Sequence, residues 1–250
     1  MKKTKIHSFT LIELLAVIGI VALLFGVFAP AFTRMMFGGK VDRMAANFKT
    51  GMEIAQAKAV ASRKFVAMII PSLYDEIGDS KLKPYCGGGY RLAYVKKDGD
   101  KWLFNGWVAG SQWNNMADGA MLTGIQNRKD WLDDNKKLKE LPDPVSETST
   151  AFSGHGKLRV IDDNGFSGGN TEDADVKALY SSTGEKNNLK GLIFTPYGGC
   201  VGSSEPYIFF FTEAQVNSGK YEYTNKDNFV MLKLNSITGK VVYLPTEDGE

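Results

Sequence analysis

Glu13 is the residue near the start of the chain whose type and position point to specific chemistry. It precedes an apolar run, Leu14 to Phe32, in which every residue is apolar, glycine or proline. That length matches the ~20 residues that a helix needs to cross the hydrocarbon core of a bilayer. A carboxylate at the edge of such a helix costs about 2–3 kcal/mol unless it is paired or reaches water. We therefore expect Glu13 to have a partner.

A second group of oxygen-bearing side chains lies in a stretch rich in glycine and asparagine. Its members that are candidate ligands are Asp162, Asp163, Asp173 and Asp175. Carboxylate oxygens can hold Ca²⁺, but the spacing does not match an EF-hand loop. We favour a solvated acidic loop over a weak calcium site, and we expect no cofactor.

The two cysteines, Cys86 and Cys200, lack the C-x-x-C spacing of a structural zinc site. Outside the cytoplasm they can form one disulfide, and two free thiols fit the sequence equally well. Residues 164–169 vaguely resemble a serine-protease loop, but Phe166 stands where the aspartate is needed. Residues 86–90 lack the lysine and helix of a phosphate loop. The sequence therefore does not predict an enzyme.

The amino-terminal segment differs from an ordinary secretory signal peptide in three ways. Its apolar run is longer than a signal core, no small-x-small cleavage site follows Phe32, and Glu13 stands at its start. Three lysines precede the run, which predicts a cytoplasmic amino terminus and an extracytoplasmic remainder. We expect a single-pass membrane protein.

The residues from Ser8 to Leu15, SFTLIELL, resemble the class III signal of type IV prepilins and type II secretion pseudopilins. The resemblance implies that prepilin peptidase cleaves between Ser8 and Phe9 and N-methylates Phe9. It also implies that Glu13 attracts the Phe9 amine of a neighbouring subunit, each charge offsetting the other's burial cost. Serine replaces the glycine that usually precedes the phenylalanine, so slower processing is expected. Many relatives have a proline matching Pro30, where we expect a helix kink or a simple helix end.

A helix is expected to continue over residues 34–63, with Gly38-Gly39 as an expected interruption. Its apolar positions recur at helical spacing and predict a face packed against a sheet. These positions are Val41, Met44, Ala45, Phe48, Met52, Ala55 and Ala59.

Strand signals follow the helix and make the pattern α+β, with an antiparallel sheet. The predicted strands are residues 65–70, 90–95, 102–108, 192–195, 207–211, 229–234 and 240–244. Turn residues predict one hairpin through 97–100 and another through 235–239. Of three consecutive phenylalanines, Phe209 to Phe211, at least one is expected to point outward because side chains alternate along a strand.

The expected organisation is a leader (1–8), a transmembrane and polymerisation segment (9–33), an amphipathic helix (34–63) and a β-rich periplasmic domain (64–250). Residues 109–189 are polar and rich in turn residues. We interpret them as a long, loop-rich insertion between sheet halves, not as a second domain.

The domain resembles the H-type minor pseudopilins of type II secretion and the related FimT minor pilins, the GspH/FimT family. The resemblance rests on the stretches 55–66, 192–198 (LIFTPYG) and 237–242. DNA-binding relatives have an arginine-rich end, whereas this chain ends in the acidic residues Glu247, Asp248 and Glu250. Without residues 1–8 the chain has 27 basic and 28 acidic residues, a formal charge of −1. Both features disfavour nucleic acid as a partner.

The sequence therefore predicts a structural subunit, a minor pseudopilin or pilin of a type II secretion pseudopilus or a type IV pilus-like filament. Expected partners are the other pilins, prepilin peptidase, the inner-membrane assembly platform and, before assembly, the lipid bilayer. The alternative is a minor pilin that binds DNA or a surface. Composition does not distinguish the secretion machine from the pilus machine.

Overall fold

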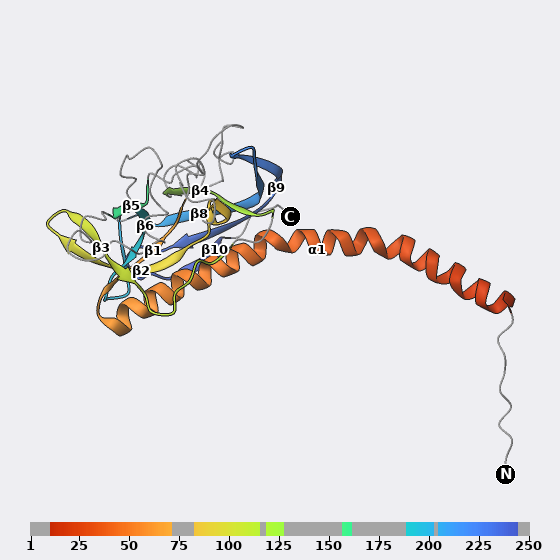
Figure 1. Cartoon of the computed structure of the whole chain (residues 1–250), viewed down its shortest axis with the longest axis horizontal. Helices are drawn as coiled ribbons and strands as arrows, with labels where there is room; N and C mark the ends of the chain where they lie inside the picture. Colours follow the sequence, from red (N-terminus) through yellow and green to blue (C-terminus); the bar gives the residue numbers. More distant parts are fainter. Residues whose placement is uncertain are drawn as a thin grey trace, which may run out of the picture. The chain divides into compact units, whose positions relative to one another are not determined.

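The structure is a computed structural model of the chain (Figure 1). It describes residues 11–71, 83–115, 119–127, 157–161, 189–202 and 205–244. Side chains before Gly39 are described at only a few positions. The chain divides into two compact units, Met1–Gly39 and Lys40–Glu250.

Helix α1, Leu11–Ser62, is one unbroken element of 52 residues. It continues through Gly38 and Gly39, where the sequence predicted an interruption. The seven apolar positions predicted to form the packed face are confirmed, since each is at most 2% exposed. Among the residues described, no helix combines the length and the apolar character needed to span a membrane.

The carboxyl end of α1 closes with two backbone hydrogen bonds. The N–H of Arg63 bonds to the carbonyl of Val60, and the N–H of Lys64 bonds to the carbonyl of Ala59. Arg63 has a φ of 52°, in the left-handed region. This is the Schellman arrangement, in which glycine is the usual left-handed residue. The chain then turns directly into β1, Phe65–Ile69.

The first sheet in the described part has six antiparallel strands in the order β3-β2-β1-β6-β5, with β7 paired to β6. Besides β1 its strands are β2 (Arg91–Asp98), β3 (Lys101–Trp107), β5 (Arg159–Ile161), β6 (Leu189–Phe194) and β7 (Cys200–Val201). A short 3₁₀ helix, η1 (Lys83–Tyr85), precedes β2. The hairpin predicted through 97–100 is confirmed, since Asp98 pairs with Lys101.

A second, antiparallel sheet has the order β10-β9-β8-β4 (Figure 1). Its strands are β4 (Met121–Asn127), β8 (Tyr207–Asn217), β9 (Lys220–Leu234) and β10 (Val241–Leu244). Ser218 and Gly219, both with positive φ, form the two-residue turn between β8 and β9. The hairpin predicted through 235–239 joins β9 to β10 and is confirmed. The prediction of a single sheet was wrong, because β4, β8, β9 and β10 pair separately.

Both sheets contribute to the main core, which covers the packed face of α1. The ring of Phe48 on α1 lies in this main core. Its centroid is 5.4 Å from the ring centroid of Phe209 and 5.2 Å from that of Phe211. Phe210 lies in a separate cluster with Ile208 and Met231. The expected alternation is confirmed, since Phe209 and Phe211 pack toward α1 whereas Phe210 belongs to another cluster, and all three side chains are buried. Alternate residues of β1 serve the main core and a second core on the other side of the first sheet.

The interpretation of 109–189 as a loop-rich insertion missed two strands, β4 and β5. Strand β4 pairs along its length with β8, so this stretch supplies an edge of the second sheet. Its apolar residues are interrupted by Thr123 and Gly124, which hid the strand pattern. Thr123 is buried, and its hydroxyl lies 3.0 Å from that of Thr212 on β8. The remaining parts of the predicted insertion, 116–118, 128–156 and 162–188, lie outside the described residues.

Candidate interaction surface

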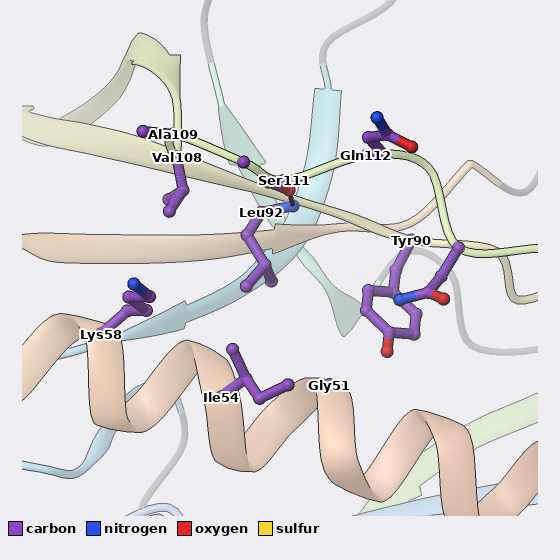
Figure 2. Close-up of a pocket in the computed structure, with 11 residues that line it drawn as sticks. Gly51, Ile54, Lys58, Tyr90, Leu92, Val108, Ala109, Ser111 and Gln112 are labelled. Carbon is purple, nitrogen blue, oxygen red and sulfur yellow. Dashed lines mark hydrogen bonds between the residues drawn. The ribbon is translucent and has the colours of Figure 1, made fainter.

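A hollow of about 300 Å³ opens between α1 and the chain segment that follows β3 (Figure 2). We call it the Tyr90 hollow. Its lining residues are Gly51, Ile54 and Lys58 of α1, Tyr90 and Leu92, and the segment Val108, Ala109, Gly110, Ser111, Gln112 and Asn114. Figure 2 shows Ile54 rising from the helix toward Leu92, and Tyr90 reaching down toward Gly51.

The close contact between Tyr90 and α1 sets the inner end of the hollow. The Tyr90 hydroxyl donates a hydrogen bond of 3.1 Å to the carbonyl of Asn47. The ring stacks edge-on against Phe48, with centroids 5.8 Å apart. A Cβ on Gly51 would lie 2.3 Å from the Tyr90 ring, so only glycine lets the ring approach. Burial raises the pKa of Tyr90, which keeps its hydroxyl neutral and able to donate.

The outer wall of the hollow is a segment that is fixed to β2. The N–H of Val108 bonds to the carbonyl of Leu92, and the N–H of Leu92 bonds to the Ser111 hydroxyl. Arg91 donates from Nε to the Ser111 carbonyl at 3.1 Å, and its guanidinium lies 4.1 Å from the Trp107 ring centroid. These bonds hold the hollow open as a preformed surface.

The lining of the Tyr90 hollow offers both apolar and polar contacts to a bound group. Ile54, Leu92 and Val108 provide aliphatic walls, and hydroxyl and amide groups stand around the opening. Lys58 is exposed, and none of the lining residues is acidic, so the hollow has positive character. It is suited to a largely apolar group that ends in a hydrogen-bonding or negative atom.

The residues predicted to control processing and assembly are not described as a site. Ser8 and Phe9 lie outside the described residues. Glu13 and Pro30 lie in the backbone of α1, and their side chains are outside what the structure describes. Asp162, Asp163, Asp173 and Asp175 also fall outside it. In the rest of the chain no group of three or more potential metal ligands comes together.

Cys86 and Cys200 are both buried, and the structure has no disulfide between them. They belong to different hydrophobic clusters, Cys86 to the second core and Cys200 to the main core. Burial raises the pKa of each thiol from 9.0 to about 12. Neither thiol is therefore suited to act as a nucleophile near neutral pH.

Sequence reasoning missed the Tyr90 hollow because its lining comes from three separate parts of the chain. Among the lining residues, Gly51 is the one whose sequence context indicates a close contact. A glycine inside a strongly periodic helix costs stability, which points to close packing at that position.

Comparison with known proteins gives one structural similarity. No protein-family profile matches the sequence, and no curated protein matches it. The crystal structure of the type IV minor pilin FimU from Pseudomonas aeruginosa aligns with 85% of this chain and 93% of its own. The sequence identity is 10% and the TM-score is 0.37. These values are too low for conclusions to pass from that protein to this chain.

Proposed function

We propose that the chain is a structural subunit of a type IV pilin-like filament. The observation that carries the proposal is the motif SFTLIELL, residues 8–15, immediately followed by the apolar run that ends at Phe32. Helix α1 includes that run, and its later part supplies the packed face of the globular unit. One element of secondary structure therefore joins the polymerisation segment to the domain that it would carry.

The proposed mechanism uses two charges at the start of the mature chain. Cleavage after Ser8 makes Phe9 the amino terminus and gives it a charged amine. That amine and the Glu13 carboxylate of a neighbouring subunit attract each other strongly where the surroundings are apolar. Pairing removes the cost of keeping Glu13 unpaired at a membrane edge. The same pair fixes the axial register between subunits.

The finer assignment is to a minor pseudopilin or pilin of the H type. Residues 9–33 would hold the subunit in the inner membrane, with residues 64–250 outside the cytoplasm, until the assembly platform extracts it. The leader, 1–8, would be removed by prepilin peptidase. The stretches 55–66, 192–198 and 237–242 support this subfamily. A type II secretion pseudopilus and a type IV pilus remain two candidate filaments.

The test is mass spectrometry of the mature chain, purified from a strain with active prepilin peptidase. The expected amino terminus is N-methylated Phe9. The same strain without the peptidase is the control, and it should yield the chain with its leader attached. An intact Met1 terminus in the presence of active peptidase would contradict the proposal.

A further inference from the structure

The charges of the chain are unevenly distributed along its sequence. The two stretches that frame the Tyr90 hollow, 49–64 and 90–115, contain eight basic and three acidic residues, a net charge of +5. Residues 9–250 as a whole have a formal charge of −1, so the other residues of that range together have −6. A positive region on an otherwise acidic chain attracts negative groups.

Three lysines of this region lie on the side of the first sheet that faces α1. Lys58 rises from α1 at the hollow (Figure 2). The Lys64 ammonium lies 5.3 Å from the ring centroid of Tyr94, which packs against the main core. Because side chains alternate along a strand, Lys96 lies on the same face of β2 as Leu92 and Tyr94. We call Lys58, Lys64 and Lys96 the lysine face.

The lysine face is not neutralised by nearby acids. All three lysines are exposed, and within the part of the chain that the structure describes none of them is in an ion pair. Glu53 of α1 is paired with Lys49. The hairpin between β2 and β3 has two acidic residues flanked by two basic ones: Asp98, Asp100, Lys97 and Lys101. The positive charge beside the hollow therefore stays available to a partner.

The distance from the hollow to the far end of the lysine face fits a short peptide. Leu92 lines the hollow, and Lys96 lies four residues further along β2, about 13 Å away at ~3.3 Å per residue. An extended peptide of about five residues covers that distance. A single segment can therefore place one apolar side chain in the hollow and its acidic side chains beside the lysines.

The rim of the hollow has backbone groups that suit a peptide. Residues 108–111 form a turn, closed by a 2.9 Å bond from the N–H of Ser111 to the carbonyl of Val108. At the centre of this turn the N–H groups of Ala109 and Gly110 form no backbone hydrogen bond within the described residues. They can donate to the carbonyl groups of a bound peptide.

We propose that the Tyr90 hollow and the lysine face bind an acidic segment of another protein, with one large apolar residue seated in the hollow. Ile54, Leu92 and Val108 remove that residue from water, and the lysines attract the carboxylates beside it. The interaction does not require polymerisation, so it goes beyond the proposed function.

The lining of the hollow favours a peptide over a nucleic acid. Proteins that bind single strands stack the bases on exposed aromatic rings. Tyr90, the aromatic residue that lines the hollow, is only 6% exposed, and the large side chains beside it are aliphatic. Three lysines also give few phosphate contacts for useful affinity at physiological salt.

The test is fluorescence anisotropy with the full-length chain in a mild detergent and a labelled peptide, Glu-Asp-Glu-Leu-Asp-Glu-Asp. The peptide should bind, and its dissociation constant should rise about tenfold from about 50 to about 300 mM salt, because salt screens exposed charges. Serine in place of the leucine removes the apolar anchor, and glutamine and asparagine in place of the acids remove the charge. Each of these peptides should bind at least about fivefold more weakly.

Two pairs of variants locate the binding surface. Ile54→Glu places a negative charge in the hollow and should weaken binding about tenfold. Its matched control is Val60→Glu, about 120° away around α1, which should leave binding unchanged. The two side chains are similarly exposed, at 45% and 48%, so both variants should keep the melting temperature. Lys58→Gln should weaken binding about two- to fivefold and reduce its salt dependence, whereas Lys240→Gln, at an exposed turn, should do neither.

Four results would overturn the proposal. One is the absence of peptide binding up to about 1 mM. Another is an equal loss of binding in Ile54→Glu and Val60→Glu. A third is an oligonucleotide of similar length that binds more tightly than the peptide and depends equally on Lys58. The last is self-association of the chain that Ile54→Glu abolishes, since a second copy would then occupy the hollow.

Discussion

Gly51 shows how a single residue shapes the Tyr90 hollow. A methyl group there would overlap the Tyr90 ring, since its carbon would lie 2.3 Å from Cζ. We predict that Gly51→Ala lowers the free energy of unfolding by about 1–3 kcal/mol, the usual cost of overpacking. Denaturant unfolding of the purified chain, followed by circular dichroism, measures the change.

Gly39 provides the matched control for Gly51. It is also a helical glycine, but a Cβ there meets nothing within 4 Å. Gly39→Ala should therefore leave stability unchanged or raise it by up to about 1 kcal/mol, since alanine favours the helix. Equal losses in both variants would show that the Tyr90 contact is not the cause.

The two buried thiols give a prediction about pH. Burial raises the pKa of both Cys86 and Cys200 to about 12, against 9.0 when the chain is unfolded. Their contribution to stability is therefore complete below pH 9 and is lost as the pH rises from 9 toward 12. At pH 8, iodoacetamide should label neither thiol in the folded chain and both in 6 M guanidinium, as read by mass spectrometry. Rapid labelling of either thiol in the folded chain would contradict the burial.

At the scale of elements, the end of α1 contains a residue under conformational strain. Arg63 takes the left-handed position of a Schellman motif, which costs a residue with a Cβ about 1–2 kcal/mol. We predict that Arg63→Gly raises the free energy of unfolding by about 0.5–1 kcal/mol, because glycine's greater freedom in the unfolded chain offsets part of the gain. Arg63→Ala retains the strain and is the control. Thermal unfolding of both variants shows whether relief of the left-handed backbone strain at position 63 causes the gain in stability.

Elements whose apolar residues recur at a regular spacing could be predicted from the sequence. Elements in which that spacing is interrupted could not. The packed face of α1 was predicted residue by residue, since each apolar position repeats at helical spacing and is buried. The hairpins through 97–100 and 235–239 were also predicted, because their turns have glycine or asparagine where the backbone needs them, but the hairpin between β8 and β9 was not. Strand β9 was predicted only over 229–234, since its first part, from Lys220, is polar and exposed in places. Pairing with β8, and not its own pattern, makes that part a strand.

The Tyr90 hollow and the paired turns at 195–199 and 235–240 could not be predicted from sequence for a different reason. Gln56 joins turns that lie 142 and 182 residues away. Such contacts depend on how the two sheets pack on α1, and no local pattern encodes them. The stretch 192–198 was noticed as a family resemblance, but the exposure of Tyr197 is known only from the fold.

The whole molecule divides into two compact units, Met1–Gly39 and Lys40–Glu250. The proposed function needs both, since the first would polymerise and the second would supply lateral contacts. These roles are separable by mutation. A change in the globular unit should affect the contacts that this unit makes, whereas a change at Glu13 should affect entry into the filament.

We predict that Glu13→Gln leaves membrane insertion intact and abolishes assembly. Glutamine keeps the size of the side chain and removes the charge, so the Phe9 amine of a neighbour loses its partner. An amine left unpaired in apolar surroundings is strongly unfavourable, and register is lost with it. Sheared filaments and membrane fractions, probed with an antibody to the globular unit, should show the variant only in the membrane.

Glu13→Asp is the control, because it retains the charge on a side chain shorter by one methylene. It should keep part of the assembly that Glu13→Gln loses, since the attraction depends on charge and distance. Assembly of Glu13→Gln at the level of the unmodified chain would exclude the charge pair as the source of register. A loss in Glu13→Gln together with normal methylation of Phe9 would place the defect after processing, at the step where subunits pair.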